Sequence, residues 1–320
     1  MKKIVFTTRM PSDWFAPLSA HTLVMPAGEA LSADETREEM KECDILVSTF
    51  SFAVTADIMA AAPRLRLIAN LGVGYNNIDT AAATEKRIIV TNTPQPVIEP
   101  TAEHTFVLML GAAHRVAELD RKMRMPQSPI RFGVMENLGT AISGKTLGII
   151  GMGRIGQSVA RKAAAFGMRV IYYNRHRLPA EKESELHAEY MPLDGLLQKS
   201  DIVTLHTPYT PESHHIIDSR ALSLMKPTAI LVNTARGACV DEQALVKHLA
   251  DGKIWGAALD VYEHEPQVSP ELYKMDNVLL SPHVGTATVE CRQAMAQCVC
   301  DNIHAFINSQ YERMDWVNKF

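Results

Sequence analysis

The sequence predicts an α/β protein of two domains, each built around a parallel sheet. Short apolar runs alternate with longer amphipathic segments along most of the 320 residues, a pattern typical of βαβ units. A chain of 35.4 kDa is also longer than one hydrophobic core usually serves. A glycine-rich turn at 151–156 joins an apolar run to an amphipathic one, as in a doubly wound sheet.

Composition excludes several other classes of protein. The hydrophobic fraction of 47% and the charged fraction of 21% are ordinary for a globular chain and exclude a disordered or collagen-like one. The net charge of −4 favours neither a nucleic-acid-binding nor a membrane-binding surface. The longest apolar run, Phe106–Ala113, is too short to span a bilayer. Five cysteines without a CxxC spacing indicate neither a disulfide framework nor a zinc site, so we expect a reduced, cytoplasmic protein without a metal.

Two series of apolar runs predict the strands of the two sheets. The expected strands of the first series are Lys3–Thr7, Thr22–Met25, Asp44–Ser48, Arg66–Asn70 and Ile88–Thr91, with helices at Asp34–Glu42 and Ala53–Ala62. Those of the second series are Lys145–Gly151, Arg169–Tyr173, Asp201–Leu205, Ala229–Asn233, Trp255–Asp260 and Val278–Leu280, with helices at Arg154–Phe166 and Glu242–Ala250. Six strands with helices between them fit one complete doubly wound sheet.

A proline-rich joint, Thr93–Pro100, separates the two series. Proline stiffens such a linker and favours the start of a helix, which we expect at Thr101–His114. The stretch Met123–Asn137 lacks a period and is predicted to be an extended loop. The last helix, about Thr288–Asn308, follows the sixth strand and can return to the first domain.

The glycine-rich turn has the context of a dinucleotide-binding motif. Gly151, Gly153 and Gly156 form GxGxxG, with a strand before it and a helix, beginning at Arg154, after it. The first glycine permits the tight turn, the second permits close approach of a pyrophosphate, and the third permits packing of helix on strand. The first-turn N–H groups of the helix can bind phosphate. A nicotinamide dinucleotide is therefore the expected cofactor.

The end of the next strand favours NADP over NAD. An NAD enzyme normally has Asp or Glu here, where the carboxylate accepts hydrogen bonds from the ribose and repels a 2′-phosphate. This chain has Asn174, followed by Arg175, His176 and Arg177. A neutral amide with two guanidinium groups behind it suits a 2′-phosphate.

Three polar residues follow three later strands, at the edge where open α/β sheets bind their ligands. They are Arg236 after the fourth strand of the second series, Glu265 after the fifth and His283 after the sixth. An arginine, a glutamate and a histidine that converge at this edge could bind a carboxylate, orient an imidazole and move a proton. The other histidines, His104, His114, His206 and the His214–His215 pair, are expected to have no role in the chemistry, and the methionines read as core residues.

These segments together resemble the D-isomer specific 2-hydroxyacid dehydrogenase family over essentially the whole chain. The similarity rests on Asn70–Asp79, Pro100–Glu103, the glycine turn and the segments around Arg236, Glu265 and His283. It is greatest to the glyoxylate/hydroxypyruvate reductase and 2-ketogluconate reductase branch. The resemblance implies a flavodoxin-like substrate domain of residues 1–99 plus 289–320 and a Rossmann-type cofactor domain of residues 100–288. It also implies an active site in the cleft between them and a homodimer formed through the cofactor domain.

The resemblance also implies residue roles in the reduction of a small 2-keto acid to a D-2-hydroxy acid. Arg236 would hold the substrate carboxylate and His283 would act as general acid/base, with Glu265 as the partner that favours its imidazolium form. The loop of Leu71, Gly72, Val73 and Gly74 would bind the carboxylate through backbone N–H groups. The implied cofactor contacts, besides the glycines and residues 174–177, are Thr101, Arg154, Ile155, Thr207, Pro208, Thr234, Ala235, Asp260 and Gly285.

Two other functions remain open at this stage. A D-3-phosphoglycerate dehydrogenase is one, although the chain has no room for the C-terminal regulatory domain that many of those carry. A nucleotide-sensing corepressor that keeps the fold but binds proteins is the other. The segment Thr49–Phe52 follows the third strand, and its two phenylalanines favour a small or weakly polar substrate side chain. It has no Lys or Arg that could pair with a substrate phosphate.

Overall fold

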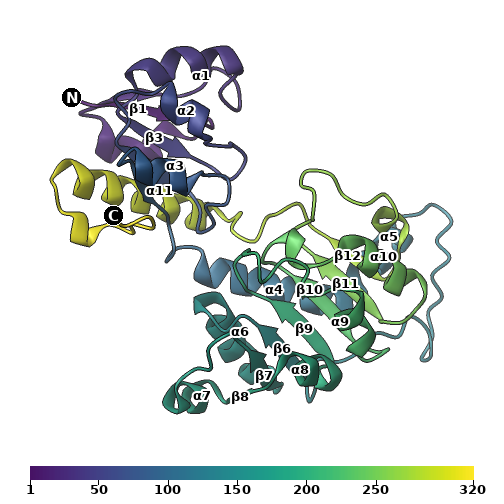
Figure 1. Ribbon diagram of the computed structural model, residues 1–320. Coiled ribbons are helices and arrows are strands. Elements are labelled where there is room, and N and C mark those ends of the chain that lie inside the picture. Colours follow the sequence, from purple (N-terminus) through teal and green to yellow (C-terminus); the bar gives the residue numbers. More distant parts are fainter. The chain divides into compact units, whose positions relative to one another are not determined.

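The computed structural model describes all residues from 1 to 320, and the chain divides into two compact units (Figure 1). The first unit comprises Met1–Val97 and Thr286–Phe320, and the second comprises Ile98–Gly285. Each unit contains one sheet, and every strand pair in both sheets is parallel. The predicted fold class, two α/β lobes with parallel sheets, is therefore confirmed.

The first unit has a five-stranded sheet in the order β2-β1-β3-β4-β5. Its strands are β1 (Lys3–Phe6), β2 (Thr22–Val24), β3 (Ile45–Ser48), β4 (Leu67–Asn70) and β5 (Ile89–Thr91). Its helices are α1 (Ala33–Glu39), α2 (Ala56–Ala60), α3 (Thr80–Glu85) and α11 (Val289–Ile307). Short 3₁₀ helices occupy Ser12–Leu18, Met40–Glu42 and Tyr311–Arg313. All five predicted strands are present, each within a residue or two of the predicted range.

Alternate residues of the first unit's strands enter separate cores on the two faces of its sheet. Ile4 and Phe6 pack with Phe15 and with Met295 of α11, whereas Val5 packs with Met59 of α2 on the other face. This division follows from the two-residue period of a strand. Because α11 covers one face, the C-terminal segment completes the core of the N-terminal sheet, as Figure 1 shows within this unit.

The second unit has a seven-stranded sheet in the order β12-β11-β10-β9-β6-β7-β8. Its strands are β6 (Thr146–Ile150), β7 (Arg169–Tyr173), β8 (Ala188–Tyr190), β9 (Ile202–Leu205), β10 (Ile230–Asn233), β11 (Gly256–Leu259) and β12 (Val278–Leu280). Its helices are α4 (Ile98–Ala113), α5 (Val116–Met123), α6 (Arg154–Ala165), α7 (Ala180–Leu186), α8 (Leu193–Lys199), α9 (Ser219–Leu224) and α10 (Glu242–Ala250). Short 3₁₀ helices lie at Gly237–Cys239 and Leu272–Lys274.

Helices cover both faces of this second sheet. Phe106 of α4 and Val159 of α6 pack on one face, and Leu196 of α8, Leu222 of α9 and Leu245 of α10 pack on the other. Because all seven strands are parallel, the loops after β6, β9, β10, β11 and β12 lie at the same edge of the sheet, where their carboxyl ends meet. No helix in the chain combines the length and the apolar character that crossing a bilayer requires.

Three details differ from the sequence prediction. The sheet has a seventh strand, β8, which was missed because its three residues include a central charged one, Glu189. The helix α4 begins at Ile98 rather than Thr101, since Pro100 falls in the first turn, where no N–H donor is needed. A further helix, α5, precedes the predicted loop, whose residues after Met123 contain no regular element before β6.

Candidate active site

The glycine turn after β6 is shaped by three different steric requirements. Gly151 has φ +98°, and a Cβ there would lie 2.6 Å from the Thr207 backbone nitrogen. A Cβ on Gly156 would lie 2.2 Å from the Gly151 carbonyl oxygen. A Cβ on Gly153 would meet no atom within 4 Å. The first and third glycines are therefore needed for packing of the protein itself, whereas the second borders open space.

That open space lies at the N-terminus of α6. Gly153 is the N-cap, and the backbone N–H groups of Arg154 and Ile155 in the first turn make no hydrogen bond within the protein. Thr207 and Pro208, which follow β9, lie beside the turn because Thr207 approaches Gly151. Free N–H groups and a positive helix end favour an anion such as a pyrophosphate. The residues present thus fit the phosphates of a dinucleotide.

Some of the residues after β7 bond to other protein groups through their side chains, and others do not. Asn174 accepts a hydrogen bond from the Met152 N–H through Oδ1, at 2.7 Å, so it closes the glycine turn. Arg175 and His176 are exposed, and Arg175 forms no ion pair. Arg177 instead forms a two-pronged ion pair with Glu183, with both N···O distances 2.8 Å.

The ion pair with Glu183 makes the guanidinium of Arg177 less available to a ligand than that of Arg175. The hydrogen bonds from Arg177 and Tyr172 lower the pKa of Glu183 to about 2. The guanidinium of Arg177 also lies over the Tyr190 ring, 5.7 Å from its centroid. Only Arg175 therefore keeps a guanidinium without a protein carboxylate partner.

Arg236 follows β10 and presents a half-buried guanidinium that forms no ion pair. Its only hydrogen bond as a donor is from Nη1 to the Ala235 carbonyl oxygen, at 2.6 Å. Asn233 holds the turn by donating to the Arg236 carbonyl oxygen and accepting from the Ala235 N–H. Burial lowers the pKa of Arg236, and the negative charge of Glu265 opposes that effect. A desolvated guanidinium without a carboxylate partner is suited to binding an anionic ligand.

Glu265 and His283, from the loops after β11 and β12, form a direct pair. His283 Nδ1 lies 2.8 Å from Glu265 Oε2, and the other carboxylate oxygen accepts the Tyr262 N–H at 3.0 Å. Burial would raise the pKa of Glu265, but the hydrogen bond and charge of His283 hold it below its usual 4.5. The carboxylate therefore stays ionised and fixes the orientation of the imidazole.

Asp260, at the end of β11, is almost completely buried and organises the loop that carries His283. Its Oδ1 accepts hydrogen bonds from His104 Nε2, Ser281 Oγ and the Val284 N–H, and its Oδ2 accepts from the Gly285 N–H. Its backbone carbonyl accepts the His283 N–H at 2.8 Å. Burial alone would raise the pKa of Asp260, but these hydrogen bonds lower it. Asp260 is thus held as an anion by the loop itself.

His104 is a residue that sequence reasoning missed. It lies on α4 and bridges Asp260 and Ser281 at 3.2 and 3.1 Å. Its position three residues after Thr101, and so on the same face of α4, is the only signal that could have identified it. Thr101 itself is buried near Gly285, and Thr234 is tied to α4 by a 2.9 Å hydrogen bond to Thr105.

The loop after β4 in the first unit has an unusual distribution of hydrogen bonds. The carbonyl oxygens of Gly72, Val73 and Gly74 accept hydrogen bonds from Asn70, Asn92 and the Thr93 N–H. The N–H of Leu71 reaches Ser48 and that of Gly72 reaches Asn70, but those of Val73 and Gly74 have no acceptor. Two adjacent free N–H groups beside carbonyl groups that are already hydrogen-bonded are available to donate to an anionic ligand.

Comparison with known proteins gives consistent results for this chain. Residues 106–285 match the family model described as "D-isomer specific 2-hydroxyacid dehydrogenase, NAD binding domain". A glyoxylate reductase of Thermococcus onnurineus is 44% identical over 313 residues, which cover 96% of this chain and 93% of that protein.

Two solved structures are similar over nearly their whole length. A glyoxylate reductase of Paecilomyes thermophila superposes with a TM-score of 0.85 at 34% identity, covering 97% of this chain and 96% of that one. An NADPH-dependent glyoxylate/hydroxypyruvate reductase of Sinorhizobium meliloti, in complex with NADP and malonate, has a TM-score of 0.80 at 30% identity. That alignment covers 96% of this chain and 94% of the other.

The different surroundings of two glycines lead to a testable prediction. Gly156→Ala should lower the free energy of unfolding by about 1–3 kcal/mol, since its Cβ would overlap the Gly151 carbonyl. Gly153→Ala should unfold at the wild-type temperature but bind NADPH roughly tenfold or more weakly, because its Cβ enters the space assigned to the pyrophosphate. Thermal unfolding and fluorescence titration measure the two effects. Wild-type cofactor affinity in Gly153→Ala would contradict the assignment.

Proposed function

The chain belongs to the D-isomer specific 2-hydroxyacid dehydrogenase family, and we propose that it reduces small 2-keto acids of the glyoxylate, hydroxypyruvate or 2-ketogluconate type with NADPH as the preferred cofactor. It is an oxidoreductase that reduces a 2-keto acid to the D-2-hydroxy acid with NAD(P)H. The observation that carries the proposed mechanism is the arrangement after three neighbouring strands, β10, β11 and β12. There a half-buried guanidinium without an ion pair accompanies a carboxylate–imidazole pair with a 2.8 Å contact.

We assign the substrate carboxylate to Arg236. Its guanidinium forms no ion pair, and its planar group can also contact the carbonyl oxygen that becomes negative during reduction. When bound, NADPH would supply a hydride to C2 of the keto acid. His283 donates its proton to the developing alkoxide and becomes a neutral imidazole, while Glu265 keeps the ring oriented. In the reverse direction His283 takes the proton back.

The same reasoning assigns the cofactor phosphates to the Gly153 space and to the first-turn N–H groups of α6. Asp260 and Gly285 lie beside His283 and would border the nicotinamide. Asn174 and Arg175 would meet the adenosine ribose. The S. meliloti protein, which was solved with NADP, supports the choice of a phosphorylated cofactor.

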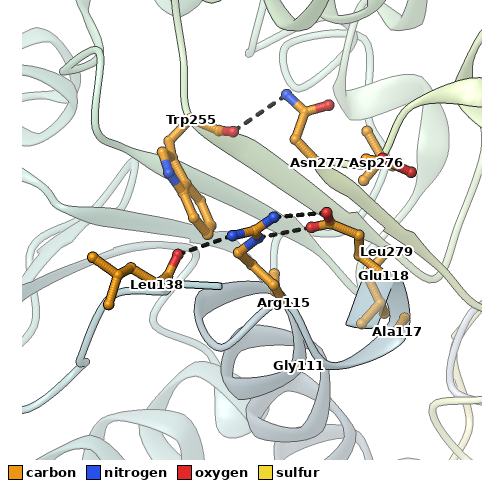
Figure 2. Close-up of a pocket in the computed structure, with 11 residues that line it drawn as sticks. Gly111, Arg115, Ala117, Glu118, Leu138, Trp255, Asp276, Asn277 and Leu279 are labelled. Atoms are coloured by element: carbon orange, nitrogen blue, oxygen red, sulfur yellow. Dashed lines mark hydrogen bonds and ion pairs between the residues drawn. The ribbon is translucent and has the colours of Figure 1, made fainter. Parts of the chain in front are cut away.

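We propose a homodimer formed through residues 107–138 of the cofactor unit. Large apolar side chains are exposed throughout this segment: Val107, Val116, Met123, Met125, Phe132, Val134, Met135 and Leu138, with Phe132 and Val134 at 90% and 93%. A pocket of about 220 Å³ lies beside them, lined by Arg115, Glu118, Leu138 and Trp255 among others (Figure 2). Figure 2 shows Arg115 bound to both the Glu118 carboxylate and the Leu138 carbonyl, which ties the last residue of the segment to the start of α5. Many large apolar side chains exposed in one segment are typical of a protein interface, and a second copy of the chain is the proposed occupant.

Substrate identity is tested by initial rates of the purified protein. Glyoxylate, hydroxypyruvate, 2-ketogluconate and 3-phosphohydroxypyruvate are each offered with NADH and with NADPH. We expect turnover of at least one of the first three and little of the phosphorylated acid. Preferential reduction of 3-phosphohydroxypyruvate would contradict the proposal, and so would the absence of any turnover.

Removal of the proposed catalytic groups should separate binding from chemistry. His283→Ala should lower kcat/KM for reduction by about 10²–10⁴ with cofactor affinity nearly unchanged, because only the general acid is lost. Arg236→Ala should also lose orders of magnitude, with a raised KM for the keto acid. His187→Ala and Arg220→Ala serve as controls, since His187 directly follows α7 and Arg220 lies on α9, and neither belongs to these loops. Either catalytic variant keeping more than half of the wild-type value would show that its role is assigned wrongly.

The Glu265–His283 pair should determine the pH dependence of reduction. Reduction needs the imidazolium, so kcat/KM falls as pH rises and the proton is lost. Glu265→Gln removes the anion that favours the imidazolium, so this fall should move to lower pH. Because the pKa of Glu265 is itself lowered, its own protonation should affect wild-type rates only below about pH 4.5. Superimposable profiles of variant and wild type would argue against the pair.

Cofactor preference should depend on Asn174 and Arg175. One charge-assisted contact to a 2′-phosphate contributes roughly 1.5–3 kcal/mol, or about one to two decades in affinity. We expect a lower KM for NADPH than for NADH, with the difference shrinking as salt rises because Arg175 is exposed. The double variant Asn174→Asp, Arg175→Gln should invert the preference. Arg177→Gln is the control. This variant should still prefer NADPH over NADH, since the Arg177 guanidinium already forms an ion pair with Glu183.

The proposed interface is tested by sedimentation equilibrium. The wild-type protein should sediment at about twice the 35.4 kDa chain mass. Phe132→Asp combined with Val134→Asp should yield monomers, because two charges would be buried in an apolar contact. Tyr273→Asp, an equally drastic change at another exposed aromatic residue of the same unit, should remain dimeric. A monomeric wild type would overturn the proposal.

A further inference from the structure

A third histidine–carboxylate pair, His215 and Glu263, lies two residues from Glu265 and is not used in the proposed mechanism. His215 Nε2 lies 2.6 Å from Glu263 Oε1, which makes it one of the shortest side-chain contacts around these loops. Both side chains are largely buried, with 31% and 13% of their side-chain surface exposed. Burial would raise the pKa of Glu263, but the hydrogen bond from His215 keeps it below its usual value, so the carboxylate stays charged.

Glu263 also joins its loop to the N-terminus of α10. Its Oε2 accepts the Glu242 N–H at 3.1 Å, and the Glu242 carboxylate accepts the Glu263 N–H at 3.0 Å. Glu242 further accepts the Ser269 N–H at 2.9 Å. This reciprocal arrangement satisfies the first helical N–H and holds both ends of the 263–269 turn on one helix end.

His215 belongs to a segment that is paired with the loop carrying Arg236. The His215 N–H donates to the Ala238 carbonyl at 2.9 Å, and Ile217 forms a parallel bridge with Val240. The same loop meets the 262–263 backbone directly, since a Cβ on Gly237 would lie 1.9 Å from the Tyr262 carbonyl carbon. Only glycine allows two backbones to come so close.

We propose that His215 and Glu263 form a positioning pair that holds the turn bearing Glu265 against the loop bearing Arg236. The pair bonds residue 263 to a segment that is itself bonded to residues 238–240. Arg236 and Glu265 therefore keep their relative positions, and through Glu265 so does His283. The inference rests on the proposed function, because it concerns residues assigned to the reduction of a 2-keto acid. Small displacements at such residues have large effects on rate.

The test is a double-mutant cycle on glyoxylate reduction. His215→Ala should lower kcat roughly tenfold or more, with the KM for NADPH within about twofold of wild type. His215→Gln, which keeps a donor to Glu263, should recover most of the lost rate. If His215 acts through Glu265, then His215→Ala should have a much smaller effect in the Glu265→Gln background than in the wild type.

A matched control separates positioning from general destabilisation. His248→Gln removes another buried imidazole of the same unit, one that bonds Ala244 and Ser223 far along α10 from the catalytic loops. It should lower the unfolding temperature but leave kcat and the pH profile unchanged. A similar loss of kcat in His248→Gln would overturn the proposal.

A second readout does not depend on turnover. The imidazole ¹⁵N chemical shifts of His283 report its hydrogen bond to Glu265, and they should change in His215→Ala but not in His248→Gln. Three results would each overturn the positioning role. They are independent (multiplicative) effects of the His215→Ala and Glu265→Gln substitutions on kcat, unchanged chemical shifts of His283, and a raised KM for NADPH as the only effect. A wild-type protein without keto-acid turnover would instead overturn the proposed function, and the His283 shifts would still test the pair.

Discussion

The loops after β11 and β12 in the second unit depend on the hydrogen bonds that the buried carboxylate of Asp260 accepts. Four donors from α4 and from residues 281–285 converge on it, and its backbone carbonyl holds the N–H of His283. A buried anion is costly unless it is hydrogen-bonded, so these donors stabilise Asp260 in place. The same hydrogen bonds hold the loop after β12, in which His283 Nδ1 lies 2.8 Å from Glu265 Oε2.

The six residues after β11 include three carboxylates, each of which contacts a histidine. Asp260 contacts His104, Glu263 contacts His215, and Glu265 contacts His283. The three carboxylates differ in exposure: Asp260 is almost completely buried, Glu263 mostly buried and Glu265 about one-third exposed. Asp260 and Glu263 also accept backbone N–H groups of Val284, Gly285 and Glu242, so these two pairs hold the backbone of the loops around the Glu265–His283 pair.

Both units also leave backbone N–H groups without acceptors at the ends of their strands. In the second unit these are at the first turn of α6, and in the first they are at Val73 and Gly74. In both cases the neighbouring carbonyl groups or side chains are hydrogen-bonded within the protein, so the free N–H groups are the donors that a ligand can use. In the second unit, the N–H groups of α6 suit a pyrophosphate and the guanidinium of Arg236 suits a carboxylate.

The sequence by itself determined the parallel α/β class, most strands and the glycine turn, because these depend on short-range patterns of polarity and on local steric limits. Strand β8 was not predicted, because its three residues with a central glutamate have no such pattern. Only the tertiary structure decided how the polar residues are partnered. Arg177 is engaged by Glu183, and Arg236 by no carboxylate, yet both arginines follow strands and look alike in the sequence. His104 meets Asp260 across 156 residues of chain, and His215 meets Glu263 across 48. Such contacts arise from strand order and loop paths, and no local pattern specifies them.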